Sequence, residues 1–168
     1  MTELRIGAPN EKQRRFLLDR HRYIAYGGAR GGGKSWAVQT KAKLLALRYA
    51  GIKLLIVRRT LRELQNNHID PLRQELAGIA KYKAADKRFE FPNGSTITFG
   101  YCACDGDMGQ YQGAEYDVVF LDEAGQLQKA WIDAINACVR GTNGLPKRTY
   151  YTPVSYTHLR AHETRSNL

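Results

Sequence analysis

The sequence GGARGGGKS, at residues 27–35, decides the fold of this chain. It fits the phosphate-binding loop pattern GxxxxGK(S/T) through Gly28, Gly33, Lys34 and Ser35. In such a loop, backbone N–H groups close around phosphate oxygens, the lysine reaches the outer phosphates, and the hydroxyl binds Mg²⁺. A merely flexible glycine loop would leave the lysine and the serine unexplained. The stretch therefore predicts a site for a nucleoside triphosphate with Mg²⁺.

The residues on both sides of the loop support this interpretation. RYIAY at 22–26 is typical of a short strand, and apolar residues recur at helical spacing from Val38 to Tyr49. Strand, glycine loop and helix therefore follow one another in the order that the motif needs. The loop residues expected to contact the nucleotide are Gly28, Ala29, Arg30, Gly31, Gly32, Gly33, Lys34 and Ser35.

A pair of carboxylates follows a second apolar strand. The run DVVFLDEA at 117–124 ends in Asp122 and Glu123. In a phosphate-loop protein the first such carboxylate holds Mg²⁺, and the second can orient and deprotonate the attacking water. Without the glycine loop, the pair would indicate the acidic start of a helix. With the loop, we assign Asp122 and Ser35 to Mg²⁺ and Glu123 to the catalytic base.

Two more side chains are candidates with alternatives left open. Arg30 lies inside the glycine loop, where it could reach the γ-phosphate as a catalytic arginine or remain a solvated loop residue. Gln13 has capping-box spacing with Asn10, and it could also contact adenine from the helix before the loop. His21 and His68 have no partner spacing, so we assign them no role.

Composition narrows the class of protein. The 168 residues fit one domain, and no apolar run approaches the roughly twenty residues that a membrane span needs. The net charge of +10 favours a polyanionic partner, nucleic acid before membrane, with a solvated basic surface as the alternative. The three cysteines include no CxxC pair, so we expect neither disulfides nor a zinc site.

Strand and helix patterns alternate along the chain. Asn93-Gly94 separates two alternating apolar runs in FEFPNGSTITFGY, at 89–101, which predicts a β-hairpin. We therefore expect an α/β fold with a mostly parallel, doubly wound sheet flanked by helices and an inserted hairpin. Further strands are predicted near 53–59, 116–121 and 148–152, and further helices near 10–20, 60–79 and 129–139.

Together these segments resemble the ATPase domain of the large terminase subunit of tailed bacteriophages, the motor that packages DNA into a preformed capsid. The resemblance runs from about Ala8 to Thr152 and rests on NEKQRRFL, YGGARGGGKS, LLIVRRT, FPNGSTITFG, YQGAEYDVVFLDEAGQL and RGTNGLPKRTYYT. It implies a P-loop NTPase fold of the RecA/ASCE type, in which the strand at 148–152 lies between the glycine-loop strand and the Asp122 strand. The hairpin and YQGAEYD separate this family from helicases.

The resemblance also implies an activity. The protein would be a Mg²⁺-dependent ATPase that drives double-stranded DNA into the procapsid, in the cytoplasm of the bacterial host. Its partners would be DNA, the small terminase subunit, the portal protein and further copies in a homo-oligomeric ring. By the same resemblance, Gln13 would contact adenine, and Lys34 and Ser35 would bind phosphate and Mg²⁺. Asp122 would bind Mg²⁺, and Glu123 would be the catalytic base.

The chain departs from the family pattern near its end. The family's RNase H-like nuclease domain is absent from the sequence, so DNA cleavage is not assigned. Residues 154–168 resemble a translated sequencing-library adapter, a divergent natural tail being the alternative. We therefore expect an incomplete P-loop ATPase domain at 1–153 and a non-native tail at 154–168. Thr152 would be the last residue of the coupling motif, facing the γ-phosphate, and the chain alone would hydrolyse ATP slowly.

Two other functions share part of this pattern. A P-loop helicase or repair ATPase would keep the glycine loop and the carboxylate pair but lack the hairpin and YQGAEYD. A non-catalytic DNA-binding fragment would keep the glycine loop without nucleotide turnover. Replacing Lys34 or Glu123 separates these functions from the motor.

Overall fold

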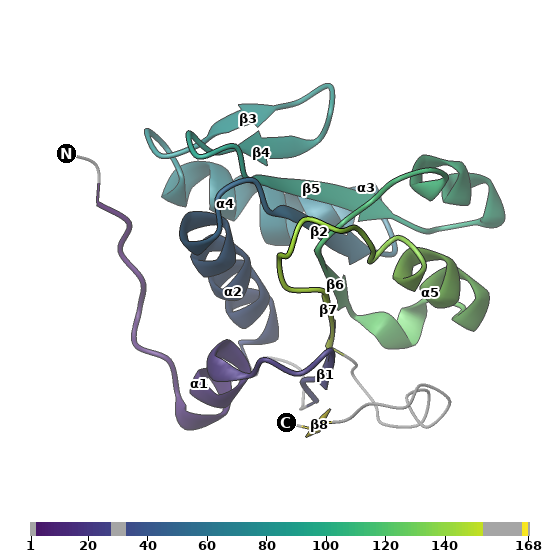
Figure 1. Ribbon diagram of the computed structural model, residues 1–168, viewed down its shortest axis with the longest axis horizontal. Helices are drawn as coiled ribbons and strands as arrows, with labels where there is room; N and C mark the ends of the chain where they lie inside the picture. The colour runs from purple at the N-terminus through teal and green to yellow at the C-terminus, as the bar shows by residue number, and fades with distance from the viewer. Residues whose placement is uncertain (1–2, 28–32, 153–165, 168) are drawn as a thin grey trace.

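The computed structural model describes residues 3–27, 33–152 and 166–167 (Figure 1). Five residues of the predicted loop, Gly28 to Gly32 with Arg30 among them, lie outside the described residues, as does most of the segment 154–168. The roles predicted for them stay predictions. Among the described residues, no helix is long and apolar enough to cross a membrane.

The elements alternate between strand and helix, as expected. In chain order they are α1 (Glu11–Leu18), β1 (Tyr23–Ala25), α2 (Lys34–Arg48), β2 (Lys53–Arg58), α3 (Leu61–Leu64), the π-helical turn η1 (Gln65–Ile69), α4 (Asp70–Glu75), β3 (Lys81–Lys83), β4 (Arg88–Glu90), β5 (Thr96–Tyr101), the 3-10 helix η2 (Asp105–Tyr111), β6 (Val118–Asp122), the 3-10 turn η3 (Ala124–Gln126), α5 (Lys129–Asn136), β7 (Arg148–Thr152) and β8 (Ser166–Asn167).

The described strands form one mixed sheet in the order β3-β4-β5-β2-β6-β7-β1-β8. The pairs β3–β4 and β4–β5 are antiparallel and the other pairs are parallel. The hairpin is therefore confirmed as β4 and β5. β7 lies between β6 and β1, as the resemblance implied. β6 and β7 are buried along their whole length, which is typical of central parallel strands.

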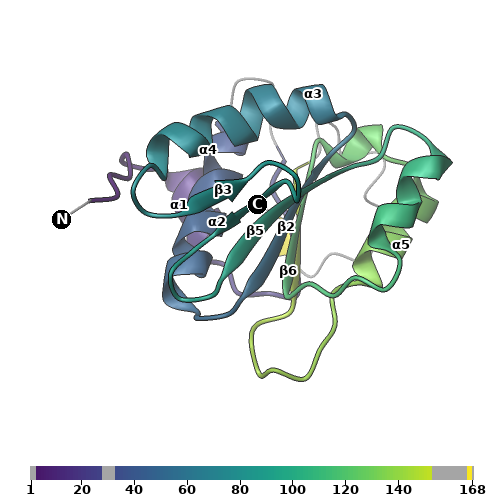
Figure 2. The same cartoon turned by 90° about the horizontal axis from the view of Figure 1, so that it is seen from above.

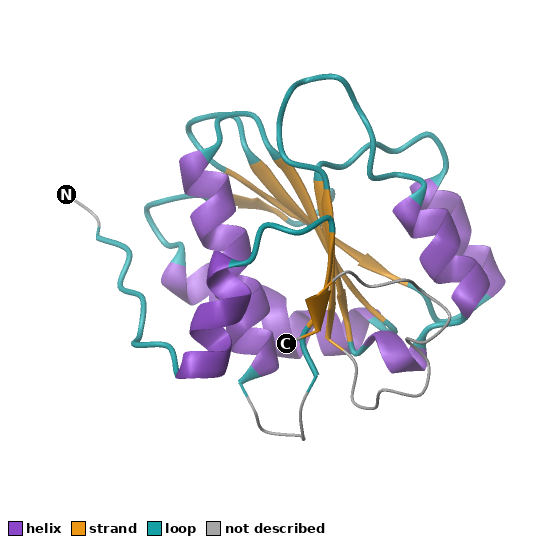
Figure 3. Cartoon of the chain, turned by 60° about the horizontal axis from the view of Figure 1, so that its bottom comes forward, coloured by secondary structure: helices purple, strands orange, loops and turns teal. Residues whose placement is uncertain are grey.

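Helices cover both faces of the sheet. α1, α2, α3 and α4 lie over one face, and α5 with the 3-10 segments lies over the other (Figures 2 and 3). Each face has its own apolar core: Phe16, Ile56 and Phe120 belong to the first, and Val57, Leu121 and Trp131 to the second. The fold is the three-layer P-loop NTPase architecture that the sequence predicted.

The helix ends follow from local chemistry. Asn10 and Gln13 form the predicted capping box at the start of α1, which ends at Leu18 because Asp19 has an extended backbone. The helix predicted near 60–79 is present as three successive segments, α3, η1 and α4. α4 begins at Asp70 with Pro71 in its first turn, and the helical backbone is kept at both junctions of the π-turn η1.

The strand β3 was not predicted. Its three residues pair with β4 at the edge of the sheet, and two of them are exposed lysines. Lysines on an edge strand oppose pairing with a second chain, and three residues are too few to show an alternating pattern. The hairpin is therefore one part of a three-stranded antiparallel extension of the sheet.

Candidate active site

Those predicted site residues that the structure describes gather around the carboxyl ends of the parallel strands. β6 ends at Asp122 and β7 at Thr152, and these two residues are direct partners in the ladder. β1 lies on the other side of β7, and the chain enters the glycine loop after it. Ligands of open α/β sheets bind at this edge, where the strand order reverses. The site therefore follows from the order of the strands.

Gly33 fixes the start of α2. Its φ of +69° places it in the left-handed region, which favours glycine. A Cβ there would also collide with the Gln13 side chain. Gln13 donates from Nε2 to the Gly33 carbonyl at 3.3 Å, while its Oε1 accepts from the Asn10 N–H at 2.9 Å. The capping role of Gln13 is thus confirmed, and the same side chain reaches the end of the glycine loop.

The two halves of the predicted site meet. Ser35, in the first turn of α2, donates from Oγ to Asp122 Oδ2 at 3.3 Å. Lys34 also lies in this turn, and its side chain is largely buried. These residues are far apart in the sequence, so only the fold brings them together. A hydroxyl and a carboxylate are hard oxygen ligands of the kind that Mg²⁺ prefers.

Asp122 is almost fully buried, at 1 % exposure, and is surrounded by donors. Among the described residues, it accepts from Ser35, from His68 Nε2 at 2.6 Å and from Thr152 Oγ1. Arg58 Nε lies 3.7 Å from Oδ2. Burial alone would raise the pKa of Asp122, but the hydrogen bonds from His68 and Thr152 and the charge of Arg58 outweigh it, so the pKa is lowered. The carboxyl is therefore ionised at neutral pH.

Glu123 has an unusual backbone. Its φ of 57° and ψ of 44° are left-handed, which is uncommon for a residue other than glycine, and such conformations cluster at active sites. Its N–H donates to Thr152 Oγ1 at 3.1 Å, and its carboxylate lies 3.4 Å from Arg58 Nη2. Glu123 precedes only the three-residue turn η3 and makes no side-chain cap bond there. Glu123 therefore stands at the start of η3 without capping it through a side-chain hydrogen bond.

Three residues around the site, His68, Gln39 and Arg58, were not predicted from the sequence. His68 was assigned no role, yet it is fully buried and hydrogen bonded to Asp122, so that assignment is corrected. Gln39 lies one helical turn after Ser35, and its Nε2 is 3.0 Å from His68 Nδ1. Arg58 could have been found from the sequence, because it ends an apolar strand, β2, and the carboxyl ends of parallel strands lie at the same edge of a sheet. In the structure β2 pairs in parallel with β6, the strand that ends at Asp122.

The described residues contain no group of three or more His, Cys, Asp or Glu side chains that could hold a metal ion by themselves. Ser35 and Asp122 nevertheless fit Mg²⁺, because Mg²⁺ in phosphate sites is held by one or two protein oxygens together with waters and substrate phosphates. The described residues therefore fit a metal that arrives with its nucleotide.

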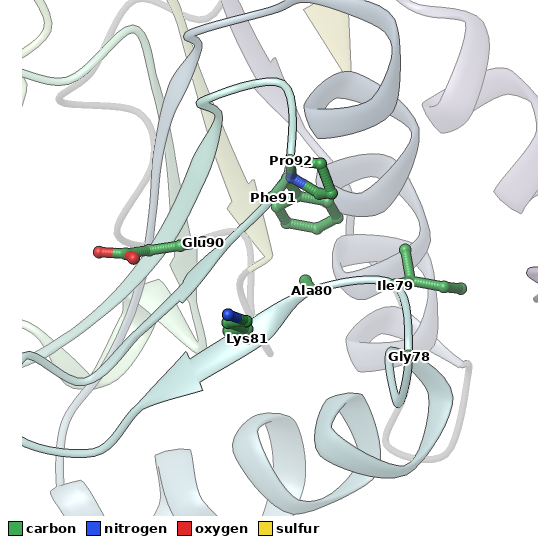
Figure 4. Close-up of a pocket in the computed structure, with 7 residues that line it drawn as sticks. All are labelled: Gly78, Ile79, Ala80, Lys81, Glu90, Phe91 and Pro92. Atoms are coloured by element: carbon green, nitrogen blue, oxygen red, sulfur yellow. The ribbon is translucent and has the colours of Figure 1, made fainter.

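A cavity of about 480 Å³ lies away from this site. Figure 4 shows it between the turn after α4 and the β4–β5 turn, where Phe91 and Pro92 face Ile79 and Ala80. The Glu90 carboxylate points away from these side chains (Figure 4). None of the predicted site residues lines this cavity, and we assign it no part in the site.

Comparison with known proteins gives the family. The family model described as "Terminase large subunit, T4likevirus-type, N-terminal" matches residues 25–159. No curated protein matches the chain.

Solved structures show the same fold. The large terminase of a thermophilic bacteriophage in complex with ADP has a TM-score of 0.73 and 16% identity, over 94% of this chain and 44% of that chain. The ATPase domain of the Thermus phage P74-26 large terminase has a TM-score of 0.66 and 18% identity, over 87% and 65%. The N-terminal domain of the DNA packaging ATPase from bacteriophage phi29 has a TM-score of 0.60 and 16% identity, over 88% and 80%.

The chain thus spans less than half of the thermophilic bacteriophage terminase that it resembles. The family model covers well over half of the chain, from the β1 strand past the end of β7. The chain therefore belongs to the family of T4likevirus-type terminase large subunits, whose N-terminal part it matches.

Proposed function

We propose that this chain is the ATP-hydrolysing motor domain of a terminase large subunit, which drives double-stranded DNA into the procapsid. The observation that carries the proposal is the contact between Ser35 and Asp122, because it joins the glycine loop to the carboxylate strand. Solved structures of the thermophilic bacteriophage large terminase contain ADP and ATP-gamma-S, which supports nucleotide binding by a chain of this fold.

Each residue of the site has a separate role in ATP binding or hydrolysis. Lys34 binds the outer phosphates, and Ser35 and Asp122 hold Mg²⁺. The bound ion would neutralise charge on the phosphate oxygens. Glu123 orients and deprotonates the attacking water. Its carboxylate is partly exposed, at 21 %, so water can reach it.

Three further roles complete the proposal. Gln13, whose side chain bonds to both Asn10 and Gly33, contacts the adenine ring. Thr152 couples the site to β7, because its hydroxyl bonds to both Asp122 and the Glu123 N–H. Arg30 lies in the glycine loop and stabilises the charge that develops on the γ-phosphate.

We propose that the partners are those of a packaging motor: double-stranded DNA, the small terminase subunit, the portal protein and further copies of the large subunit in a ring, in the host cytoplasm. The net charge of +10 supports an anionic partner. A helicase or repair ATPase is the second candidate, because it would use the same glycine loop and carboxylates.

The proposal is tested with Lys34→Ala. The lysine's charge-assisted bonds to phosphate contribute about 1.5–3 kcal/mol, so the variant should bind ATP about 10–150-fold more weakly. Fluorescence titration with an ATP analogue measures this, and Lys129→Ala, which removes an exposed lysine, is the matched control. Unchanged binding in Lys34→Ala would make the proposal wrong. Stimulation of hydrolysis by double-stranded more than single-stranded DNA would favour the motor over the helicase.

A further inference from the structure

His68 lies in the interior, between the metal-binding carboxylate and α2. Its side chain is fully buried. Its Nε2 is 2.6 Å from Asp122 Oδ2, and its Nδ1 is 3.0 Å from Gln39 Nε2. Both ring nitrogens of His68 thus have partners. Gln39 belongs to α2, which also carries Ser35, and Asp122 is the last residue of β6. Nothing in the proposed function explains this contact.

The π-turn η1 brings His68 to this place. Pro71 has no N–H, so it cannot donate to the carbonyl of Asn67 four residues earlier. That carbonyl instead accepts from Gln39 Nε2 at 2.5 Å, and the Asp70 N–H bonds to the Gln65 carbonyl in the wider π pattern. π-turns within helices often mark functional sites. Gln39 therefore hydrogen bonds both to the backbone of the π-turn, at Asn67, and to the imidazole ring of His68.

The hydrogen bonds fix which nitrogen carries the proton. Gln39 must direct its NH₂ group to the Asn67 carbonyl, which can only accept, and the same NH₂ group donates to His68 Nδ1. Nδ1 is therefore the acceptor, and Nε2–H donates to Asp122 Oδ2. A chain of hydrogen bonds therefore connects Gln39, in α2, through His68 to the Asp122 carboxylate.

We propose that His68 is a positioning residue for the Mg²⁺-binding carboxylate of Asp122, an inference that rests on the proposed function. Thr152 holds Oδ1, while His68 and Ser35 hold Oδ2. With both oxygens held, the carboxylate keeps its orientation toward Ser35. Without His68, Asp122 Oδ2 would keep only its longer hydrogen bond, the one from Ser35. The buried Arg58 Nε lies 3.7 Å from the same oxygen and has no hydrogen-bond partner among the described residues. The carboxylate would then turn from Ser35 toward Arg58.

The test measures how strongly Mg²⁺ tightens nucleotide binding. The dissociation constant of a fluorescent ATP analogue is determined with Mg²⁺ and with EDTA, and their ratio gives the Mg²⁺ enhancement. Losing a partner that orients a metal ligand typically costs 10–100-fold in metal affinity. His68→Leu should therefore reduce the enhancement by about 10–100-fold while binding in EDTA stays unchanged. His68→Gln places an NH₂ donor near the position of Nε2 and should retain most of the enhancement.

The outcomes separate this inference from the proposed function. If the wild-type chain shows no Mg²⁺ enhancement, the proposed function fails. If the wild-type chain shows it and His68→Leu keeps it in full, the inference is overturned, even where His68→Leu lowers the unfolding midpoint in urea. Should His68→Leu not fold, Gln39→Met releases the ring but leaves the Asp122 contact possible. It should give a smaller loss in the same direction, and an enhancement equal to that of the wild type would also overturn the inference.

Discussion

Replacing Glu123 by glutamine is expected to lower the rate of ATP hydrolysis about 10²–10⁴-fold and to leave ATP binding unchanged. Glutamine keeps the size of the side chain but cannot take a proton from water. The backbone of residue 123 is held by the bond from its N–H to Thr152, which the substitution does not touch. The predicted loss therefore falls on the chemical step alone.

Single-turnover hydrolysis with protein in excess over ATP measures this effect, because it separates the chemical step from product release. Glu115→Gln is the matched control, since it removes the same charge from an exposed residue whose partner, Arg140, is also exposed. It should hydrolyse ATP at the wild-type rate. Equal rates for Glu123→Gln and Glu115→Gln would exclude Glu123 as the base.

Asp122→Asn should lower the free energy of unfolding by about 3–5 kcal/mol, the range for breaking a buried ion pair. The amide would turn an NH₂ group toward donors that now bond to a carboxylate. It would also remove one of the two carboxylates beside the buried Arg58, leaving that of Glu123 at 3.4 Å. Urea unfolding measures the loss, and Asp86→Asn, at an exposed aspartate, is the control. A loss no larger than that of the control would contradict the geometry around Asp122.

The hydrogen bonds and the charge around Asp122 also make the stability of the folded chain depend on pH. The pKa of Asp122 is lower in the folded chain than its value near 3.9 in an unfolded chain, so the unfolded chain binds the proton more readily. The stabilising contribution of Asp122 is therefore complete above about pH 4 and is lost as the pH falls through the folded pKa. In Asp122→Asn this contribution is absent at every pH.

Much of the site could be predicted from the sequence, because it depends on short motifs beside strands. The glycine loop, the carboxylate pair and the alternation of strands together indicated that Ser35 and Asp122 lie at one edge of a parallel sheet. The structure places their side chains 3.3 Å apart. Local patterns sufficed here because the strand order of this fold is constrained by right-handed parallel connections.

The contacts around Asp122 from other elements could not be predicted in the same way. His68 lies 54 positions before Asp122, and it faces the carboxylate because of a π-turn that no 3.6-residue pattern reveals. The turn depends on a proline and on a glutamine from another helix. The left-handed backbone of Glu123 likewise has no signature in the sequence. In both cases the missing information is tertiary.

The central claim is that the glycine loop and the carboxylate strand form one metal site, and a double-mutant cycle tests it most directly. The Mg²⁺ enhancement of ATP-analogue binding is measured for the wild type, Ser35→Ala, Asp122→Asn and the double variant. Residues that share one ligand are coupled by about 0.5–3 kcal/mol. We predict a coupling energy in this range, because either substitution alone removes most of the enhancement. Additive losses would contradict the claim and place Ser35 and Asp122 in separate sites.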